Sequence, residues 1–207
     1  MSPSVAVVDY GIGNLFSAVQ GIARAGANSE LTSDPNRILK ADAVVLPGVG
    51  HFGSCMKAIR SARLEAVVKE VADKGVPFLA ICVGMQMLYD SSEEAPDVSG
   101  LGILSGEVCR LRGDVKLPHM QWNQIELTHR DWASKSNVQI LEGLDRSWMY
   151  FVHSYAPDDK SRTAAVCYYP GPITAAVAEG NIFATQFHPE KSGPDGQQLL
   201  KNFVLSL

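Results

Sequence analysis

Three short apolar runs constrain the fold more than any other feature of the sequence. They occupy residues 5–9, 43–46 and 76–82, and the first ends in a polar residue, Asp9. Continuous apolar runs of this length are typical of parallel strands that are buried on both faces. Helical spacing of apolar residues follows at residues 15–23, where Asn14 is placed as a cap, and at residues 58–74. This alternation predicts an α/β fold with a parallel sheet.

The second half of the chain has a different pattern. After about residue 100 the apolar runs become shorter and are bounded by Gly, Pro, Asp and Asn, which is typical of antiparallel or mixed strands. We expect such strands at residues 103–111, 122–127, 147–152, 163–169, 173–178 and 182–186, and a last helix after Pro194. The predicted fold is a single domain over residues 1–207, a three-layer open mixed sheet with flanking helices and a β-rich second half.

Composition excludes several classes of function. The chain has 207 residues and a net charge of -4, and its lysines and arginines are scattered, so nothing indicates a nucleic-acid surface. The apolar runs are too short to span a membrane, and residues 1–4 lead into a strand without the pattern of a signal peptide, which favours the cytosol.

The four cysteines, Cys55, Cys82, Cys109 and Cys167, have no metal-ligand or disulfide spacing, so we expect reduced thiols. His51, His119, His129 and His153 also lack a metal-binding pattern. No metal and no cofactor are predicted. Gly11 and Gly13 after the first strand suggest a dinucleotide fingerprint, but the third glycine is missing, so that interpretation is rejected.

Cys82 ends the apolar run 76–82 and is followed by a helical pattern. Ala80 and Gly84 flank it, as small residues do in a strand-to-helix elbow that presents a nucleophile on a strained turn. A thiol attacks only as a thiolate, which a helix N-terminus and a nearby imidazole favour. Taken alone, a cysteine in an apolar strand is more often a small core residue than a nucleophile.

The segment His188-Pro189-Glu190 offers the missing base and acid. In extended backbone, residues two apart point to the same side, and Pro189 favours an extended His188. Glu190 would then orient the His188 imidazole and stabilise its charged form. Alone, this segment is also compatible with a surface turn, but its occurrence together with the Cys82 elbow predicts a catalytic triad.

The chain resembles the class I (triad) glutamine amidotransferases along its whole length. The resemblance is carried by five segments in order, at residues 8–15, 46–50, 118–123, 150–155 and 186–192. It implies hydrolysis of glutamine to glutamate and ammonia through a thioester on Cys82. Asp9-Tyr10-Gly11 and His153-Ser154-Tyr155 favour the branch formed by glutaminase subunits of imidazole glycerol phosphate synthase. That branch implies a heterodimer with a cyclase subunit that receives the ammonia.

The resemblance also assigns roles to other residues. It implies an oxyanion loop, substrate contacts and a partner interface, with activity that depends on the loaded cyclase. The oxyanion residues are Gly48, Val49, Gly50 and Val83; the glutamine-binding residues are Gln86, Glu94, Ser154 and Tyr155; the interface residues are Asn14, Trp122 and Lys191.

Two positions depart from the family pattern. Ala80 and Gln121 stand where the family commonly has glycine. The alternatives are a glutaminase of the pyridoxal phosphate, anthranilate, purine or guanine branch, and a catalytically silent binding module. The intact Cys82, His188 and Glu190 argue against the silent module.

Overall fold

A computed structural model describes residues 2–128 and 138–207 of the chain. The main sheet of this described part has eight strands in the order β2-β1-β3-β4-β13-β12-β11-β8. The first five strands of that order are parallel: β1 (Ser4–Val8), β2 (Asn28–Thr32), β3 (Ala43–Gly48), β4 (Phe78–Cys82) and β13 (Ile182–Thr185). The antiparallel strands β12 (Pro172–Glu179), β11 (Thr163–Tyr168) and β8 (Glu126–Leu127) extend it. The prediction of an open mixed sheet is confirmed.

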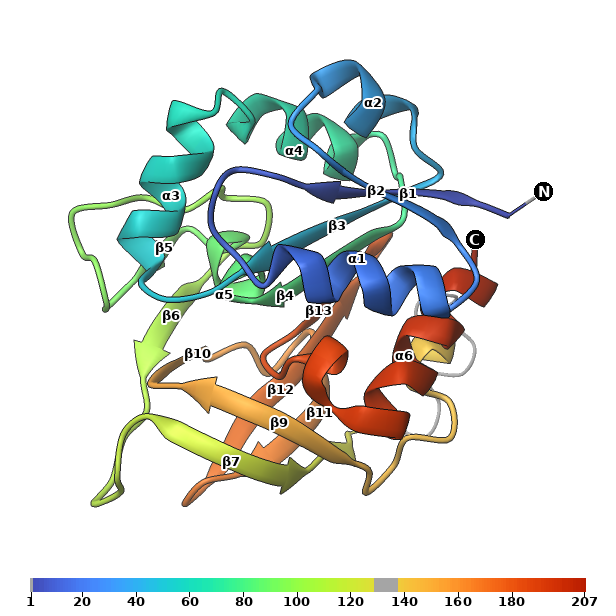
Figure 1. Cartoon of the computed structure of the whole chain (residues 1–207). Coiled ribbons are helices and arrows are strands. Elements are labelled where there is room, and N and C mark those ends of the chain that lie inside the picture. Colours follow the sequence, from blue (N-terminus) through green and yellow to red (C-terminus); the bar gives the residue numbers. More distant parts are fainter. Residues whose placement is uncertain (1, 129–137) are drawn as a thin grey trace.

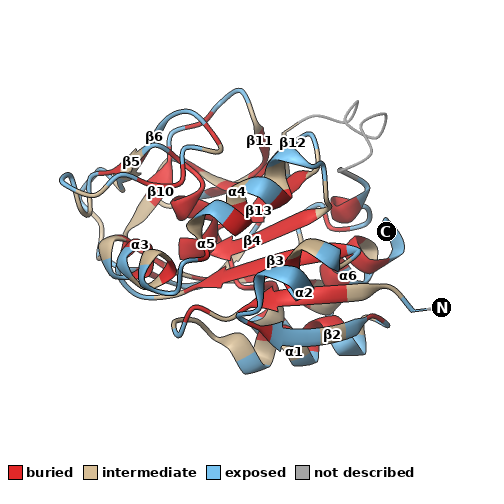
Figure 2. Ribbon diagram, turned by 90° about the horizontal axis from the view of Figure 1, so that it is seen from above, coloured by how far each residue is buried: buried red, intermediate tan, exposed pale blue. Residues whose placement is uncertain are grey.

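Helices cover both faces of the sheet, which gives three layers (Figure 1). On one face, α1 (Leu15–Arg24) packs against α6 (Gly193–Leu205). The other face carries α2 (Pro35–Lys40), α3 (Phe52–Ser61) and α4 (Glu65–Asp73). Right-handed crossovers explain this division, because β1 to β2 runs toward the sheet edge and the later connections run back across β1. The central strands β3 and β4 are buried along their whole length (Figure 2).

Two smaller sheets complete the β-rich half. One contains β5 (Ser91–Ser92), β6 (Glu107–Arg110) and β10 (Tyr155–Pro157). The other is an antiparallel ribbon of β7 (His119–Gln124) and β9 (Trp148–His153). The remaining elements are α5 (Val83–Met87) and the short 3-10 helices η2 (Val138–Leu141) and η3 (Pro189–Lys191).

The structure differs from the sequence predictions at several places. The helix expected over residues 58–74 is two helices, because the chain turns at Arg63 with φ 59° and buries Leu64 between α3 and α4. Helix α2 was not predicted, although Asp34 caps it by accepting from the Asn36 N–H. The strand expected at residues 103–111 forms only at β6.

None of the described helices has the length and apolar character needed to cross a bilayer.

The parallel strands determine where side chains of different segments meet. The carboxyl ends of β1, β3, β4 and β13 lie at one edge of the sheet, and each is followed there by a turn. In open α/β sheets, ligands bind at this edge. The turns bring together residues near positions 10, 49, 82 and 188.

Contact between backbones fixes the turn after β4. A Cβ built on Gly84 would lie 2.1 Å from the Leu46 carbonyl oxygen, so no side chain fits there. We therefore expect Gly84→Ala to lower the free energy of unfolding by about 2 kcal/mol or more, as overpacking does. The control is Gly171→Ala, where an added Cβ meets no atom within 4 Å. Its effect should stay within about 0.5 kcal/mol in denaturant unfolding, and equal stability of the two variants would contradict the account.

Candidate active site

Cys82 lies at the junction between β4 and α5 in a strained conformation. Its φ is 56° and its ψ is -113°, values that residues with a side chain rarely adopt. The strain follows from packing, because α5 begins directly over β3, where Gly48 and Gly84 approach too closely for a Cβ on either residue. The elbow therefore has the predicted geometry, and Ala80, fully buried in β4, is compatible with it.

His188 and Glu190 form a buried pair. The His188 Nδ1 lies 2.8 Å from Glu190 Oε1, and both side chains are 2% exposed. The sequence correctly predicted that the two side chains meet, but the expected reason was wrong. His188 is extended, whereas residues 189–191 form η3, whose tight turn brings Glu190 back to the imidazole.

The electrostatics of His188 favour an imidazolium. Burial alone would lower the pKa of His188, but the facing Cys82 sulfur and the Glu190 carboxylate outweigh it and raise this pKa to about 10. Glu190 Oε1 also accepts from Asn14 Nδ2 at 3.3 Å. Asn14 takes the N-cap position of α1, but its side chain makes no capping hydrogen bond, in contrast to the prediction. Glu190 Oε2 is buried and has no partner within the described part of the chain.

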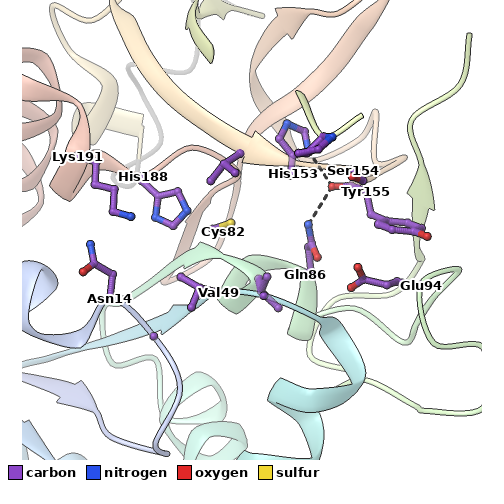
Figure 3. A pocket seen from close by; sticks show the side chains of 15 residues that line it. Asn14, Val49, Cys82, Gln86, Glu94, His153, Ser154, Tyr155, His188 and Lys191 are labelled. Atoms are coloured by element: carbon purple, nitrogen blue, oxygen red, sulfur yellow. Dashed lines mark hydrogen bonds between the residues drawn. The ribbon is translucent and has the colours of Figure 1, made fainter. Parts of the chain in front are cut away.

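A cavity of about 540 Å³ opens in front of Cys82. Figure 3 shows Cys82 between two groups of residues, with Asn14, His188 and Lys191 on one side and Tyr155 and Glu94 on the other. The other predicted residues that line it are Val49, Gly50, Val83, Gln86 and Ser154. A cavity of this size accommodates a small molecule.

Two side-chain donors contact backbone carbonyls in and beside the predicted oxyanion segment. Residues 47 and 48 are not in a loop as expected, since β3 extends through Gly48, which pairs with Cys82. The Tyr10 hydroxyl donates to the Pro47 carbonyl at 2.7 Å, and the Cys55 thiol donates to the Val49 carbonyl at 3.3 Å. No local sequence pattern predicts these two contacts.

Two of the predicted glutamine-binding side chains form hydrogen bonds with the backbone. Glu94 Oε2 accepts from the Phe52 N–H at 2.7 Å, which leaves a half-buried carboxylate at the cavity wall. Gln86 Nε2 donates to the Tyr155 carbonyl at 2.9 Å (Figure 3). A carboxylate and fixed amides suit a ligand with an ammonium group and a polar side chain.

The predicted interface residues divide into two sets. Asn14 and Lys191 line the cavity, whereas Trp122 lies outside it on β7 and is 48% exposed. Gln121 is exposed and keeps the regular β7–β9 register opposite Phe151, so it does not distort the ribbon.

Metal binding finds no support in residues 2–128 and 138–207, where no group of three His, Cys, Asp or Glu side chains could hold an ion. His119 and His153 are buried and form a hydrogen bond with each other, and the His51 side chain accepts a hydrogen bond from the Gly53 N–H. His129 lies outside the described residues.

Comparisons with known proteins identify the family of the chain. The family model for glutamine amidotransferase class-I matches residues 6–207. An imidazole glycerol phosphate synthase subunit HisH from Synechococcus elongatus is 46% identical, covering 98% of this chain and 93% of that protein. One from Bacillus cereus is 44% identical, covering 96% and 93%.

Solved structures share the fold at lower identity. PurLQS from Thermotoga maritima has a TM-score of 0.77 at 18% identity, with 99% of each chain covered. A structure described as a glutamine amidotransferase has a TM-score of 0.74 at 18% identity, with 97% of each chain covered.

The buried carboxylate should control both the charge of His188 and turnover. In Glu190→Gln the pKa of His188 should fall, because Glu190 raises it, and NMR titration of the imidazole measures the change. Hydrolytic kcat should fall by about two orders of magnitude or more, as in triads that lose their acid. Glu65→Gln, which removes a partly exposed ion pair with Arg60, is the control. An unchanged titration and kcat in Glu190→Gln would refute this role.

Proposed function

Because the chain belongs to the class-I glutamine amidotransferase family, we propose that it is the glutaminase subunit of an imidazole glycerol phosphate synthase. It hydrolyses glutamine to glutamate and ammonia and delivers the ammonia to a cyclase subunit in histidine biosynthesis. The observation that best supports this proposal is the position of Cys82. It lies on a strained elbow and faces the same cavity as His188, which forms a buried pair with Glu190. The names of relatives that are 44–46% identical over nearly the whole chain support the branch.

The first chemical step is acylation of Cys82. The thiolate attacks the side-chain amide carbon of glutamine, and the carbonyl oxygen takes the negative charge. Backbone N–H groups of Val83 and of the loop at Val49 and Gly50 stabilise this oxyanion. When the carbon–nitrogen bond breaks, His188 transfers its proton to the departing nitrogen, so ammonia leaves and a glutamyl thioester remains.

Deacylation uses the same groups. The now neutral His188 takes a proton from water, whose oxygen attacks the thioester carbon. The carbon–sulfur bond breaks, and the product leaves as the γ-carboxylic acid, which gives its proton to solvent and becomes glutamate. The thiolate and the imidazolium are regenerated. Glu190 keeps the His188 ring oriented throughout, which its 2.8 Å contact with Nδ1 supports.

Substrate orientation follows from the polarity of the cavity. The α-ammonium of glutamine would lie near Glu94, and the side-chain amide would reach Cys82. Gln86 lies between them, and Ser154 and Tyr155 also line the cavity. Ammonia is then released on the side of Asn14 and Lys191, where the partner is expected.

An exposed apolar face supports the partner surface. On one face of the β7–β9 ribbon, Trp122 pairs with Tyr150 in the strand register, and Val152 of the same face also lines the cavity. The most exposed members are Met120, Trp122 and Trp148. A contiguous apolar surface beside the site suits a permanent subunit contact.

The proposal treats residues 1–207 as one glutamine amidotransferase domain in the cytosol. The family match over residues 6–207 supports the domain assignment. The composition and the biosynthetic role named for the relatives support the location.

The decisive assay is glutamate release by the purified chain, alone and with the cyclase subunit and its phosphoribulosyl aminoimidazole carboxamide nucleotide. We expect low activity alone and a strong rise with the loaded cyclase. Cys82→Ala should lower hydrolysis by at least about 10³-fold and still bind the cyclase. Equal activity in both samples would point to another amidotransferase branch, and silence in both would favour a binding module.

The partner surface has a matched pair of exposed aromatic residues. Trp122→Ala should weaken cyclase binding by about tenfold or more in titration calorimetry, because interface tryptophans contribute strongly. Tyr168 is similarly exposed, 53% against 48%, but lies on β11 outside the ribbon. Tyr168→Ala should leave the Kd unchanged, and equal effects of the two variants would move the interface elsewhere.

A further inference from the structure

Gln186 is a buried amide that the triad mechanism does not use. It follows β13, is 0% exposed, and its backbone N–H donates to the Ala175 carbonyl at 2.8 Å. Its side chain contacts two groups of the candidate site. Oε1 accepts from Gln86 Nε2 at 3.0 Å, and Nε2 lies 3.7 Å from the Cys82 sulfur.

The orientation of this amide is determined by its neighbour. The Tyr155 carbonyl can only accept, so the contact from Gln86 Nε2 at 2.9 Å is a donation. The second Gln86 N–H then meets Gln186 at 3.0 Å and needs an oxygen there. Reversing the Gln186 amide would place two donors against each other, so its nitrogen faces the sulfur.

His153 contacts the same carbonyl from another side (Figure 3), and His119 contacts His153 in turn. His153 Nδ1 lies 2.9 Å from the Tyr155 oxygen and must donate to it. The neutral His153 then accepts at Nε2 from His119 Nδ1, which lies 3.0 Å away. Burial lowers the pKa of His153 to about 3 and that of His119 to about 4, so both rings stay neutral at physiological pH.

In each hydrogen bond of this network, the donor and the acceptor are therefore determined. The network begins at Asn123, whose Nδ2 lies 3.4 Å from His119 Nε2, and passes through His153 to the Tyr155 carbonyl. From the opposite side, the Gln86 amide is fixed by that same carbonyl. Every polar atom that orients Gln186 is thus itself constrained by another hydrogen bond.

An N–H aimed at a buried sulfur stabilises its charged form more than its neutral form. Hydrogen bonds to ionised acceptors are stronger than those between neutral groups. An amide also brings no charge and does not titrate, so it favours the thiolate without competing with His188 for a proton. Cys82 is 2% exposed and gains little from water.

We propose that Gln186 is a further catalytic residue, whose amide N–H donates to the Cys82 sulfur and stabilises the thiolate. Gln86, the Tyr155 carbonyl and the His153–His119 pair are the positioning groups that keep this N–H on the sulfur. The inference deepens the proposed function and rests on its assignment of Cys82 as the nucleophile.

The test measures the rate of alkylation of Cys82 by chloroacetamide in the full-length chain as a function of pH. Mass spectrometry of peptides from the alkylated chain identifies the modified cysteine. In Gln186→Met, an apolar residue of similar length, the pH of half-maximal alkylation should rise by about one unit, which corresponds to a tenfold loss of thiolate at a given pH. Glutamine hydrolysis should lose about tenfold in kcat, with KM changed less than about twofold. An unshifted alkylation profile with reduced hydrolysis would leave Gln186 a packing role and overturn the proposal.

Control variants separate this effect from folding. Gln197→Met removes an amide that donates to the Gly21 carbonyl on α1, and it should shift neither profile. His153→Leu should shift alkylation in the same direction as Gln186→Met, and His153→Asn should restore it, because its amide can donate to Tyr155. If Gln186→Met does not fold, the comparison of His153→Leu with His153→Asn decides the proposal. Equal alkylation profiles for these two variants would overturn it.

Failure of the proposed function gives a different result. Wild-type chain that releases no glutamate with the loaded cyclase would reject the function, whatever the alkylation shows. Wild-type chain that hydrolyses glutamine, together with a Gln186→Met variant that matches it in both measurements, would reject only the role of Gln186.

Discussion

Contact between the Gly84 backbone and the Leu46 carbonyl is the constraint on which the candidate site depends. Since no Cβ fits at Gly84 or Gly48, α5 can begin directly above β3, and the chain must turn within one residue. That residue is Cys82, and its positive φ is the strained consequence. The turn holds the sulfur at the edge where β13 delivers His188, so a contact inside the fold determines the distance between the reacting groups.

Burial makes the polar groups of this site interdependent. The His188–Glu190 pair is almost inaccessible, and the pKa of His188 is raised because the facing sulfur and carboxylate outweigh desolvation. Such a buried arrangement costs stability unless each partner is present, and its value lies in chemistry rather than in folding. The same reasoning applies to Gln186, a buried amide whose hydrogen bonds end at the sulfur.

The sequence predicted what depends on local pattern. Continuous apolar runs predict the central strands, because such strands are buried on both faces. Small residues around Cys82 predict the elbow, because they allow close contact between backbones. No Gly or Pro marks the break at Arg63, and Pro189 favours extended backbone where the structure has η3, so local pattern predicts neither feature. Contacts between segments far apart in sequence, such as that between Gln86 and Gln186, depend on the assembled sheet and have no local signal.

The central claim is that Cys82 carries the glutamyl group during turnover. The most direct measurement is acid quenching of the chain during hydrolysis of glutamine with the loaded cyclase, followed by mass spectrometry of its peptides. The account predicts a glutamyl adduct on the peptide that contains Cys82, and its loss in Cys82→Ser. Glutamate release without any adduct in the quenched sample, or an adduct on Cys55 or Cys109, would contradict it.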